Sequence, residues 1–227
     1  DFLSYWNQVT PENAGKWGFA EPARDSYNFA QLDAAYNLAK DNGLPFRFHV
    51  LLWGNQQPGW IESLSNEEQL AEIIEWFDTV AAGYPDIDYL EVVNEPDNDP
   101  PGPPSPNGNL NGNYMKALGG AGTTNYDWII KAFELARERF PNAKLMINEY
   151  GVEDNPQRAQ KIKDIVELLK ERNLIDAVGF QAHAFNTIGV NATGLKNNLE
   201  ILVSTGLPII VTEMDVDGIS GGAPDDQ

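Results

Sequence analysis

The sequence contains no cysteine, so disulfide bonds and thiolate zinc sites are excluded from its stability and its chemistry. Basic residues are also scarce: 15 Lys and Arg stand against 34 Asp and Glu, and the formal net charge is −19. A surface of this sign disfavours nucleic acids and anionic membranes as partners, because both require a basic face. A neutral ligand is compatible with it.

Long apolar runs and phosphate-binding loops are missing as well. No apolar run approaches the roughly 20 residues of a transmembrane helix, and we recognise no signal peptide. No Gly-x-Gly-x-x-Gly or Walker-type loop follows a predicted strand, which argues against a nucleotide-binding doubly wound sheet. The 227 residues are 42% hydrophobic, which is enough for one substantial core.

What the chain does contain is a regular alternation of apolar strand patterns with amphipathic helix patterns. Helix starts are marked by Ser65 with Glu68 and by Asn155 before Pro156, and Thr124 is predicted to begin another helix. The predicted strands cover residues 7–11, 46–52, 89–94, 144–148, 177–180 and 207–212. This alternation predicts an α/β fold with parallel strands, and the polar or aromatic residues that end each strand favour a (β/α)8 TIM barrel.

The predicted strand count is lower than a closed barrel needs. Such a barrel has eight strands and typically about 250 residues, whereas about six strand–helix units are evident here. We therefore expect residues 1–227 to form one barrel domain without its first strand–helix unit and its last helix–strand–helix, since a natural half barrel would expose two long sheet edges. Residues 97–113 are rich in Pro, Gly and Asn and predict a long loop, which in a compact domain is more often functional than a spacer.

Two glutamates lie at the C-terminal ends of apolar runs, which is an unusual place for a charge. Pro96 cannot donate to a sheet ladder and ends the first run at Asn94-Glu95, and Glu213 directly follows the run 207–212. One such glutamate would fit a solvated turn, but two at the ends of parallel barrel strands converge on the face that carries catalytic groups. Paired carboxylates carry out glycoside hydrolysis, one as general acid and one as nucleophile or base.

The two histidines of the chain, His49 and His183, both fall near predicted strand ends. A lone histidine is ordinarily a satisfied core residue, but this placement favours the catalytic face for each. An ionised Glu213 needs hydrogen-bond donors, and His183, itself positioned by Asp215, is the natural one. We assign no metal and expect no cofactor, because the two aspartates of residues 97–99 do not match the spacing of a calcium loop.

Four segments of the sequence resemble the glycoside hydrolase family 10 endo-1,4-β-xylanases, from the second barrel strand of that family through its seventh. Each segment is short, but their order and spacing together are specific. The segments are Val9-Thr10-Pro11-Glu12-Asn13-Ala14-Gly15-Lys16-Trp17, residues 49–60, Val92-Val93-Asn94-Glu95-Pro96, and Gly179-Phe180-Gln181-Ala182-His183 with Thr212-Glu213-Met214-Asp215. The resemblance implies an endo-acting, retaining hydrolase that cleaves β-1,4-xylosidic bonds in xylan by double displacement.

The same resemblance implies a role for individual residues. Glu95 would be the general acid/base and Glu213 the nucleophile. Asn94 would bind the 2-hydroxyl of the reacting sugar, and Tyr150 would line the floor or the aglycone side of the site. The other residues that look like part of the site are Gln181 and His183, which would frame the nucleophile, and a glycone-side set of Glu12, Asn13, Lys16, His49, Trp53 and Gln56.

The resemblance also implies partners and a location. The expected partners are xylan and xylo-oligosaccharides, with no nucleic acid and no membrane. An extracellular monomer is expected, with a signal peptide that is not in this chain. Two alternatives stay open: another retaining barrel glycosidase, such as a β-1,4-glucanase or mannanase, and a non-catalytic barrel fragment that binds xylan.

The chain departs from the family pattern beside the expected site. Trp53-Gly54-Asn55-Gln56 stands where the family usually has Trp-His-Ser-Gln, so one histidine is lost on the glycone side. Asn148-Glu149-Tyr150-Gly151 stands where the family usually has Asn-Asp-Tyr-Asn. Ala14 and Gly15 replace bulkier residues in the first segment. These departures bear on the affinity for individual sugars more than on the chemistry.

Overall fold

The computed structural model describes residues 2–102 and 113–216, and its strands form one six-stranded parallel sheet. The strands are β1 (Arg47–Phe48), β2 (Leu52–Trp53), β3 (Tyr89–Asn94), β4 (Lys144–Glu149), β5 (Ala177–Phe180) and β6 (Ile209–Val211). Their order is β1-β3-β4-β5-β6, and β2 pairs with β3 beyond the end of β1. The parallel α/β architecture predicted from the sequence is confirmed.

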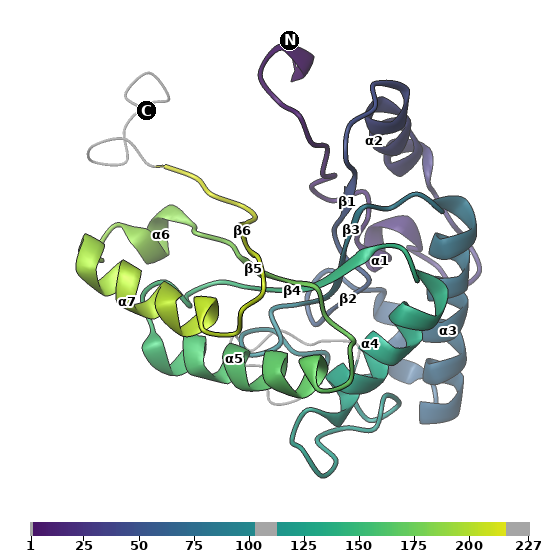
Figure 1. The fold of residues 1–227 in the computed structure, drawn as a ribbon. Helices are drawn as coiled ribbons and strands as arrows, with labels where there is room; N and C mark the ends of the chain where they lie inside the picture. The colour runs from purple at the N-terminus through teal and green to yellow at the C-terminus, as the bar shows by residue number, and fades with distance from the viewer. Residues whose placement is uncertain (1, 103–112, 217–227) are drawn as a thin grey trace.

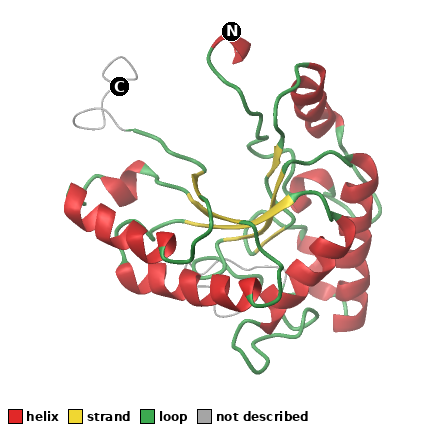
Figure 2. Cartoon of the chain, in the orientation of Figure 1, coloured by secondary structure: helices red, strands yellow, loops and turns green. Residues whose placement is uncertain are grey.

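Helices connect the strands, and the longer ones line the convex side of the curled sheet, as Figures 1 and 2 show for α3, α4, α5 and α7. The helices are η1 (Phe2–Ser4), α1 (Trp17–Ala20), α2 (Ala30–Asp41), η2 (Gly59–Ser63), α3 (Asn66–Gly83), α4 (Asp127–Arg139), α5 (Pro156–Lys170), α6 (Ala184–Thr187) and α7 (Ala192–Val203). No helix within residues 2–102 and 113–216 is both long and apolar enough to cross a membrane.

The capping signals behave as the sequence predicts in two of three helices. Ser65 and Glu68 form a complete capping box at the start of α3, and the Asn155 side chain accepts two backbone N–H groups at the start of α5. The third prediction is wrong: α4 begins at Asp127 rather than Thr124. The Asp127 carboxylate accepts the Thr124 N–H at 3.1 Å and its hydroxyl at 2.5 Å, which holds Thr124 in a turn before the helix.

Two predicted strands are also shorter than expected. The segment 7–11 makes only an isolated parallel bridge, between Val9 and Phe46, because Pro11 has no N–H with which to continue the ladder. The predicted strand 46–52 is divided into β1 and β2, which pair with separate parts of β3. Of the predicted loop 97–113, residues 103–112 lie outside the described part of the chain.

The core lies between the sheet and its helices. Trp76 of α3 is fully buried and stacks on Trp17 with ring centroids 6.0 Å apart, while Phe133 of α4 and Ile162 of α5 are also fully buried. Trp128 of α4 is likewise buried. This layer sets the positions of the strands and hence of the residues that follow them.

The register brings all the strand ends to one edge of the sheet. Asn94 aligns with Trp53 on one side and with Asn148 on the other, and Asn148 aligns with Gly179. The ladder continues one step further, because the Gln181 N–H donates to the Glu149 carbonyl at 3.0 Å. Residues that follow the strands therefore share one edge, as they do in a βα barrel.

Candidate active site

Glu95 leaves β3 in a left-handed backbone conformation, with a φ of 51°. Its N–H still donates to the Asn148 carbonyl at 2.8 Å, but Pro96 follows and the ladder ends. Glu95 is buried, with 6% of the residue exposed. A non-glycine residue in this conformation is held there by surrounding contacts, and such residues cluster at functional sites.

Three donors contact the Glu95 carboxyl. Trp53 Nε1 lies 3.0 Å from Oε2, whereas Gln181 Nε2 and Asn94 Nδ2 lie 2.8 and 3.1 Å from Oε1. Burial raises the pKa of Glu95 to about 8, and nearby carboxylates such as Glu149 add to the rise against the opposing hydrogen bond from Gln181. Glu95 is therefore protonated at neutral pH and can act as a general acid.

Glu213 follows β6 and has different surroundings, since its side chain is 28% exposed. Asn148 Nδ2 donates to Glu213 Oε1 at 2.8 Å, and His183 Nε2 lies 3.5 Å from Oε2. His183 Nδ1 lies 2.7 Å from Asp215 Oδ2. Burial tends to raise the pKa of Asp215, but hydrogen bonds from His183 and the Ala184 N–H outweigh it and hold the pKa below its ordinary value. The ionised Asp215 thus orients the imidazole toward Glu213, which is the arrangement the sequence predicts.

Side-chain amides join the two glutamates. Asn148 Nδ2 donates to Asn94 Oδ1 at 3.0 Å as well as to Glu213, and Asn94 donates in turn to Glu95. Gln181 Nε2 lies within reach of Asn94 Oδ1 at 3.3 Å and of Glu95 Oε1. Sequence reasoning singled out Asn94 and Gln181 but missed Asn148. Its position one residue before the end of β4, in line with Asn94, is the signal that could have found it.

A buried charged group inside the sheet was also missed. Glu91 of β3 is fully buried and lies 2.6 Å from Arg47 Nη1 and 2.7 Å from His49 Nδ1. Burial tends to raise the pKa of Glu91, but the charges of His49 and Arg47 outweigh it and lower the pKa. Arg47 also donates to the Thr212 carbonyl at 2.7 Å, which connects β1 to the end of β6 across the curl of the sheet. The signal in the sequence that could have revealed this buried group is a glutamate within an otherwise apolar strand.

Glu149 fixes the loop that follows Glu95. Its fully buried carboxylate accepts the Asp97 N–H at 2.9 Å, the Asn98 side chain at 2.7 Å and the Tyr150 N–H at 3.0 Å. Burial raises the pKa of Glu149 to about 7 although these hydrogen bonds oppose the rise. Tyr150, predicted to line the floor or aglycone side, is therefore held through its own backbone N–H by the Glu149 carboxylate.

A cavity of about 400 Å³ opens beside Glu213. Five of the residues predicted for the site line this hollow, namely Glu213 itself, Glu12, Lys16, His49 and His183. Glu12 is exposed at its rim, whereas Lys16 and His49 are buried. The volume and the polar lining suit part of a hydrated ligand such as a sugar.

Lys16 also connects two further predicted residues. Its Nζ donates to Asn13 Oδ1 at 2.8 Å and lies 5.1 Å from the centroid of the Trp53 ring. Burial lowers the pKa of Lys16 although the surrounding carboxylates oppose the change. Gln56 is placed differently: it is exposed and lines a separate hollow with Phe19. The structure therefore does not bring the Gln56 side chain to the cavity beside Glu213.

Comparison of the chain with known proteins identifies its family. Residues 2–224 match the model described as glycosyl hydrolase family 10. The chain belongs to this family. It is 37% identical over 219 residues to endo-1,4-beta-xylanase B of Cellvibrio japonicus, a match that covers 95% of this chain and 33% of that protein. The predicted family and its barrel fold are both confirmed.

Solved structures of glycosyl hydrolase family 10 have the same fold. A structure from Paenibacillus barcinonensis matches with a TM-score of 0.80 at 26% identity, over 95% of this chain and 64% of that one. An intracellular xylanase from Thermoanaerobacterium saccharolyticum, solved as a mutant with xylotriose, matches with a TM-score of 0.78 at 28% identity, over 97% and 69%. The chain thus spans between one third and about two thirds of the length of these relatives.

Gly54, where the family usually has histidine, lies against the loop that follows Glu95. Its N–H donates to the Asp99 carbonyl at 2.8 Å. A Cβ added at Gly54 would lie 2.1 Å from that carbonyl oxygen and 2.2 Å from the oxygen of Pro100. The backbone of this loop therefore occupies the space that a larger side chain at position 54 would need.

Replacing Gly54 by alanine is expected to lower the free energy of unfolding by about 1–3 kcal/mol, because the added methyl group forces the loop backbone to move. The loss is measured by denaturant or thermal unfolding. Gly59→Ala is the matched control, since a Cβ there meets nothing within 4 Å. Equal stability of the two variants would contradict the close approach at Gly54.

Among the residues that the structure describes, two clusters of His, Asp and Glu side chains bring their ligand atoms close enough together to hold a cation. Each already contains an ion pair: Arg47 with Glu91 at 2.6 Å, and Arg24 with Glu72 at 2.5 Å. Because an arginine occupies a carboxylate in both, neither is assigned as a metal site. The two groups are His49, Glu91 and Glu213, whose ligand atoms lie within 4.8 Å of one another, and Glu21, Asp25 and Glu72.

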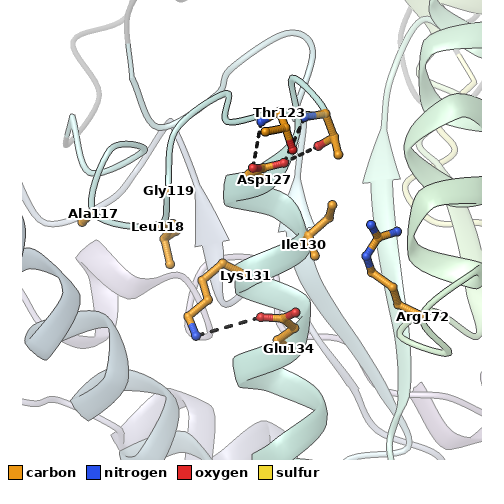
Figure 3. Close-up of a pocket in the computed structure, with 10 residues that line it drawn as sticks. Ala117, Leu118, Gly119, Thr123, Asp127, Ile130, Lys131, Glu134 and Arg172 are labelled. Atoms are coloured by element: carbon orange, nitrogen blue, oxygen red, sulfur yellow. Dashed lines mark hydrogen bonds and ion pairs between the residues drawn. The ribbon is translucent and has the colours of Figure 1, made fainter.

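A second hollow, of about 490 Å³, lies along α4 (Figure 3). Figure 3 shows Asp127 at its upper end, where the carboxylate accepts the Thr123 N–H, and the Lys131–Glu134 ion pair of 3.9 Å further along the helix. Its lining shares no residue with the cavity beside Glu213. None of the residues predicted for the active site lines this second hollow.

Proposed function

We propose that the chain acts as the catalytic domain of an endo-acting, retaining β-1,4-xylanase. The observation that supports this most is the contrast between two glutamates in one amide network. Glu95 is buried, with a pKa raised to about 8 by burial, whereas Glu213 is more exposed and accepts a hydrogen bond from Asn148. A buried carboxyl that holds its proton, beside a more exposed carboxyl that accepts a side-chain hydrogen bond, matches the acid and nucleophile of a retaining glycosidase.

In the first step, a carboxylate oxygen of Glu213 attacks the anomeric carbon while Glu95 donates its proton to the glycosidic oxygen. The bond between that carbon and oxygen breaks, the leaving sugar departs as an alcohol, and a covalent glycosyl ester forms on Glu213. Asn148 and His183 hold the attacking carboxylate, and Gln181 and Asn94 hold the acid.

In the second step, Glu95 acts as the base. Its carboxylate takes a proton from water, the water oxygen bonds to the anomeric carbon, and the ester bond to Glu213 breaks. Two displacements on the same carbon restore the original configuration. Burial of Glu95 suits its roles as acid and as base, because burial raises the affinity of the carboxylate for a proton. The proton that Glu95 takes from water therefore returns it to the acid form at the end of the cycle.

The proposed substrates are xylan and xylo-oligosaccharides. The relative solved with xylotriose and the xylanase names of the curated relatives support this choice. On this chain, Lys16 and Trp53 lie beside the pair and present a cation and an indole to a sugar on the glycone side. Secretion stays a prediction, since one structural relative is described as an intracellular xylanase.

A hydrolysis panel tests the assignment. Reducing-sugar release from xylan, carboxymethylcellulose and mannan is measured with the protein and with its Glu213→Gln variant, which controls for contaminating enzymes. We expect release from xylan only, and loss of that release in the variant. A clear preference for either of the other polysaccharides would contradict the xylan assignment and indicate a glucanase or a mannanase.

A further inference from the structure

The carboxyl of Glu149 has no part in the two proposed displacements, although it lies beside the general acid at the edge of the sheet. Asn94 of β3 aligns with Asn148 of β4, so Glu95 and Glu149 each come one residue further along neighbouring strands. Both are buried, with 6% of Glu95 and none of Glu149 exposed. Burying two acids at neighbouring strand ends is costly for the fold, which points to a use in the reaction.

The Glu149 carboxylate fastens the turn by which the chain leaves Glu95. Its Oε2 accepts the Asp97 N–H at 2.9 Å, and its Oε1 accepts the Asn98 side chain at 2.7 Å. The Asp99 N–H then donates back to the Glu95 carbonyl at 2.8 Å. These bonds fix the residues two to four positions after Glu95, and with them the left-handed φ of 51° at Glu95 itself.

The backbone of Glu149 supports the acid from a second direction. Its carbonyl accepts the Gln181 N–H at 3.0 Å, and Gln181 Nε2 lies 2.8 Å from Glu95 Oε1. Glu149 thus controls both the turn that sets the backbone of Glu95 and the amide that sets its carboxyl. A displacement of Glu149 is therefore transmitted to the carboxyl from which the proton must be delivered.

The same turn is held from the helix layer as well. Arg158 and Lys161 of α5 both pair with the Asp97 carboxylate, at 3.1 and 2.7 Å. Gly151 leaves the space for this, because a Cβ there would clash with the Arg158 guanidinium. Asp97 is held through its backbone by Glu149 and through its side chain by α5, so the turn after the acid is fixed on two sides.

The charge of Glu149 also acts on Glu95, because nearby like charges disfavour each other's ionisation. Burial is the main cause of the raised pKa of Glu95, and the carboxylates of Glu149 and Asp99 add to the rise against the hydrogen bond from Gln181. Burial likewise raises the pKa of Glu149, while the charge of Arg158 opposes it from α5. The other charged groups around the pair are Lys16 and the carboxylates that face it, namely Glu12, Glu91 and Glu213.

We propose that Glu149 is a positioning residue for the general acid, which aims the Glu95 carboxyl through the turn and the amide and holds it in the acid form through its own negative charge. The assignment rests on the proposed function. Glu149 is fully buried and acts on a substrate only through Glu95. Its loss therefore affects steps in which Glu95 transfers a proton and spares a step that needs none.

The Glu149→Gln variant tests both parts of this role, because glutamine keeps the size of the side chain but not its charge. Two substrates are compared: xylan, whose leaving sugar needs a proton, and dinitrophenyl β-xylobioside, whose leaving group needs none. On the acid side of the pH profile, the fall in kcat/KM on xylan should exceed the fall on the aryl substrate by about tenfold, since a misplaced acid delivers its proton poorly.

The pH profile on xylan reports the charge. Removing a neighbouring negative charge lowers the pKa of Glu95, so the alkaline limb of kcat/KM should move about one pH unit lower in Glu149→Gln. Glu149→Asp keeps the charge on a side chain one methylene shorter. We expect it to retain the position of the limb and to show the selective fall on xylan, and it provides the test if the glutamine variant does not fold.

Glu72→Gln is the matched control, since it removes another buried carboxylate, on α3, whose side chain is 7% exposed. It should change neither the limb nor the ratio between the substrates. An unmoved limb in Glu149→Gln, or an equal fall on both substrates in either Glu149 variant, would overturn the proposed role of Glu149. Cleavage of neither substrate by the parent protein would instead overturn the proposed function, so the two failures are distinguishable.

Discussion

Replacing Glu213 by glutamine is expected to reduce kcat on xylan by on the order of 10⁴- to 10⁶-fold, the range produced by removing single catalytic residues in a well-studied protease. The amide keeps the shape of the side chain but cannot form the glycosyl ester. Steady-state hydrolysis of xylan measures the loss, and binding of xylo-oligosaccharides by calorimetry should persist. Glu171→Gln, at an exposed carboxylate whose side chain is 72% exposed, is the control and should retain full activity.

The stereochemistry of azide rescue separates a nucleophile from a merely structural glutamate. In Glu213→Ala, azide can enter the vacated space and attack an aryl β-xylobioside directly, which inverts the anomeric carbon and yields the α-azide. In Glu95→Ala, the ester on Glu213 still forms, and azide displaces it to yield the β-azide. The opposite products, or a Glu213→Gln variant with more than a tenth of parent activity, would refute the assigned roles.

Replacing Glu95 by glutamine should produce a loss that depends on the leaving group. Hydrolysis of xylan is expected to fall by about 10²- to 10⁴-fold, the usual contribution of a general acid. An aryl β-xylobioside with a dinitrophenolate leaving group needs no proton, so its kcat/KM should stay within about tenfold of the parent value. Paired kinetics on the two substrates measure the difference.

The pH profile of the parent protein supplies the companion test. Because Glu95 must be protonated in the first step and its pKa is raised by burial to about 8, kcat/KM on xylan should fall as the pH rises through that value. The alkaline limb should disappear for the dinitrophenyl substrate in Glu95→Gln. An alkaline limb near pH 5, or one that survives the substitution, would argue against Glu95 as the acid.

The placement of Glu95 and Glu213 was predictable because it depends on local signals. Pro96 ends a strand, an apolar run ends at Thr212, and parallel strands bring their C-terminal ends to one edge. The pairing of His183 with Asp215 was predictable for the same reason, since both follow strands that prove to be neighbours.

Features that depend on long-range approach could not be predicted in this way. Nothing in residues 53–56 shows that the backbone of Asp99 and Pro100 lies against Gly54, because that contact joins segments more than forty positions apart. The same holds for Arg47, whose donation to the Thr212 carbonyl depends on the curl of the whole sheet.

The most direct measurement is to trap the glycosyl ester. An aryl 2-deoxy-2-fluoro-β-xylobioside slows both displacements, because fluorine destabilises the positively charged transition state, and the activated leaving group lets the intermediate accumulate. Intact-mass and peptide mass spectrometry are expected to find one fluoroxylobiosyl group per chain, attached to Glu213. Attachment to another residue, or time-dependent turnover of the natural substrate with no adduct formed, would contradict a retaining mechanism through Glu213.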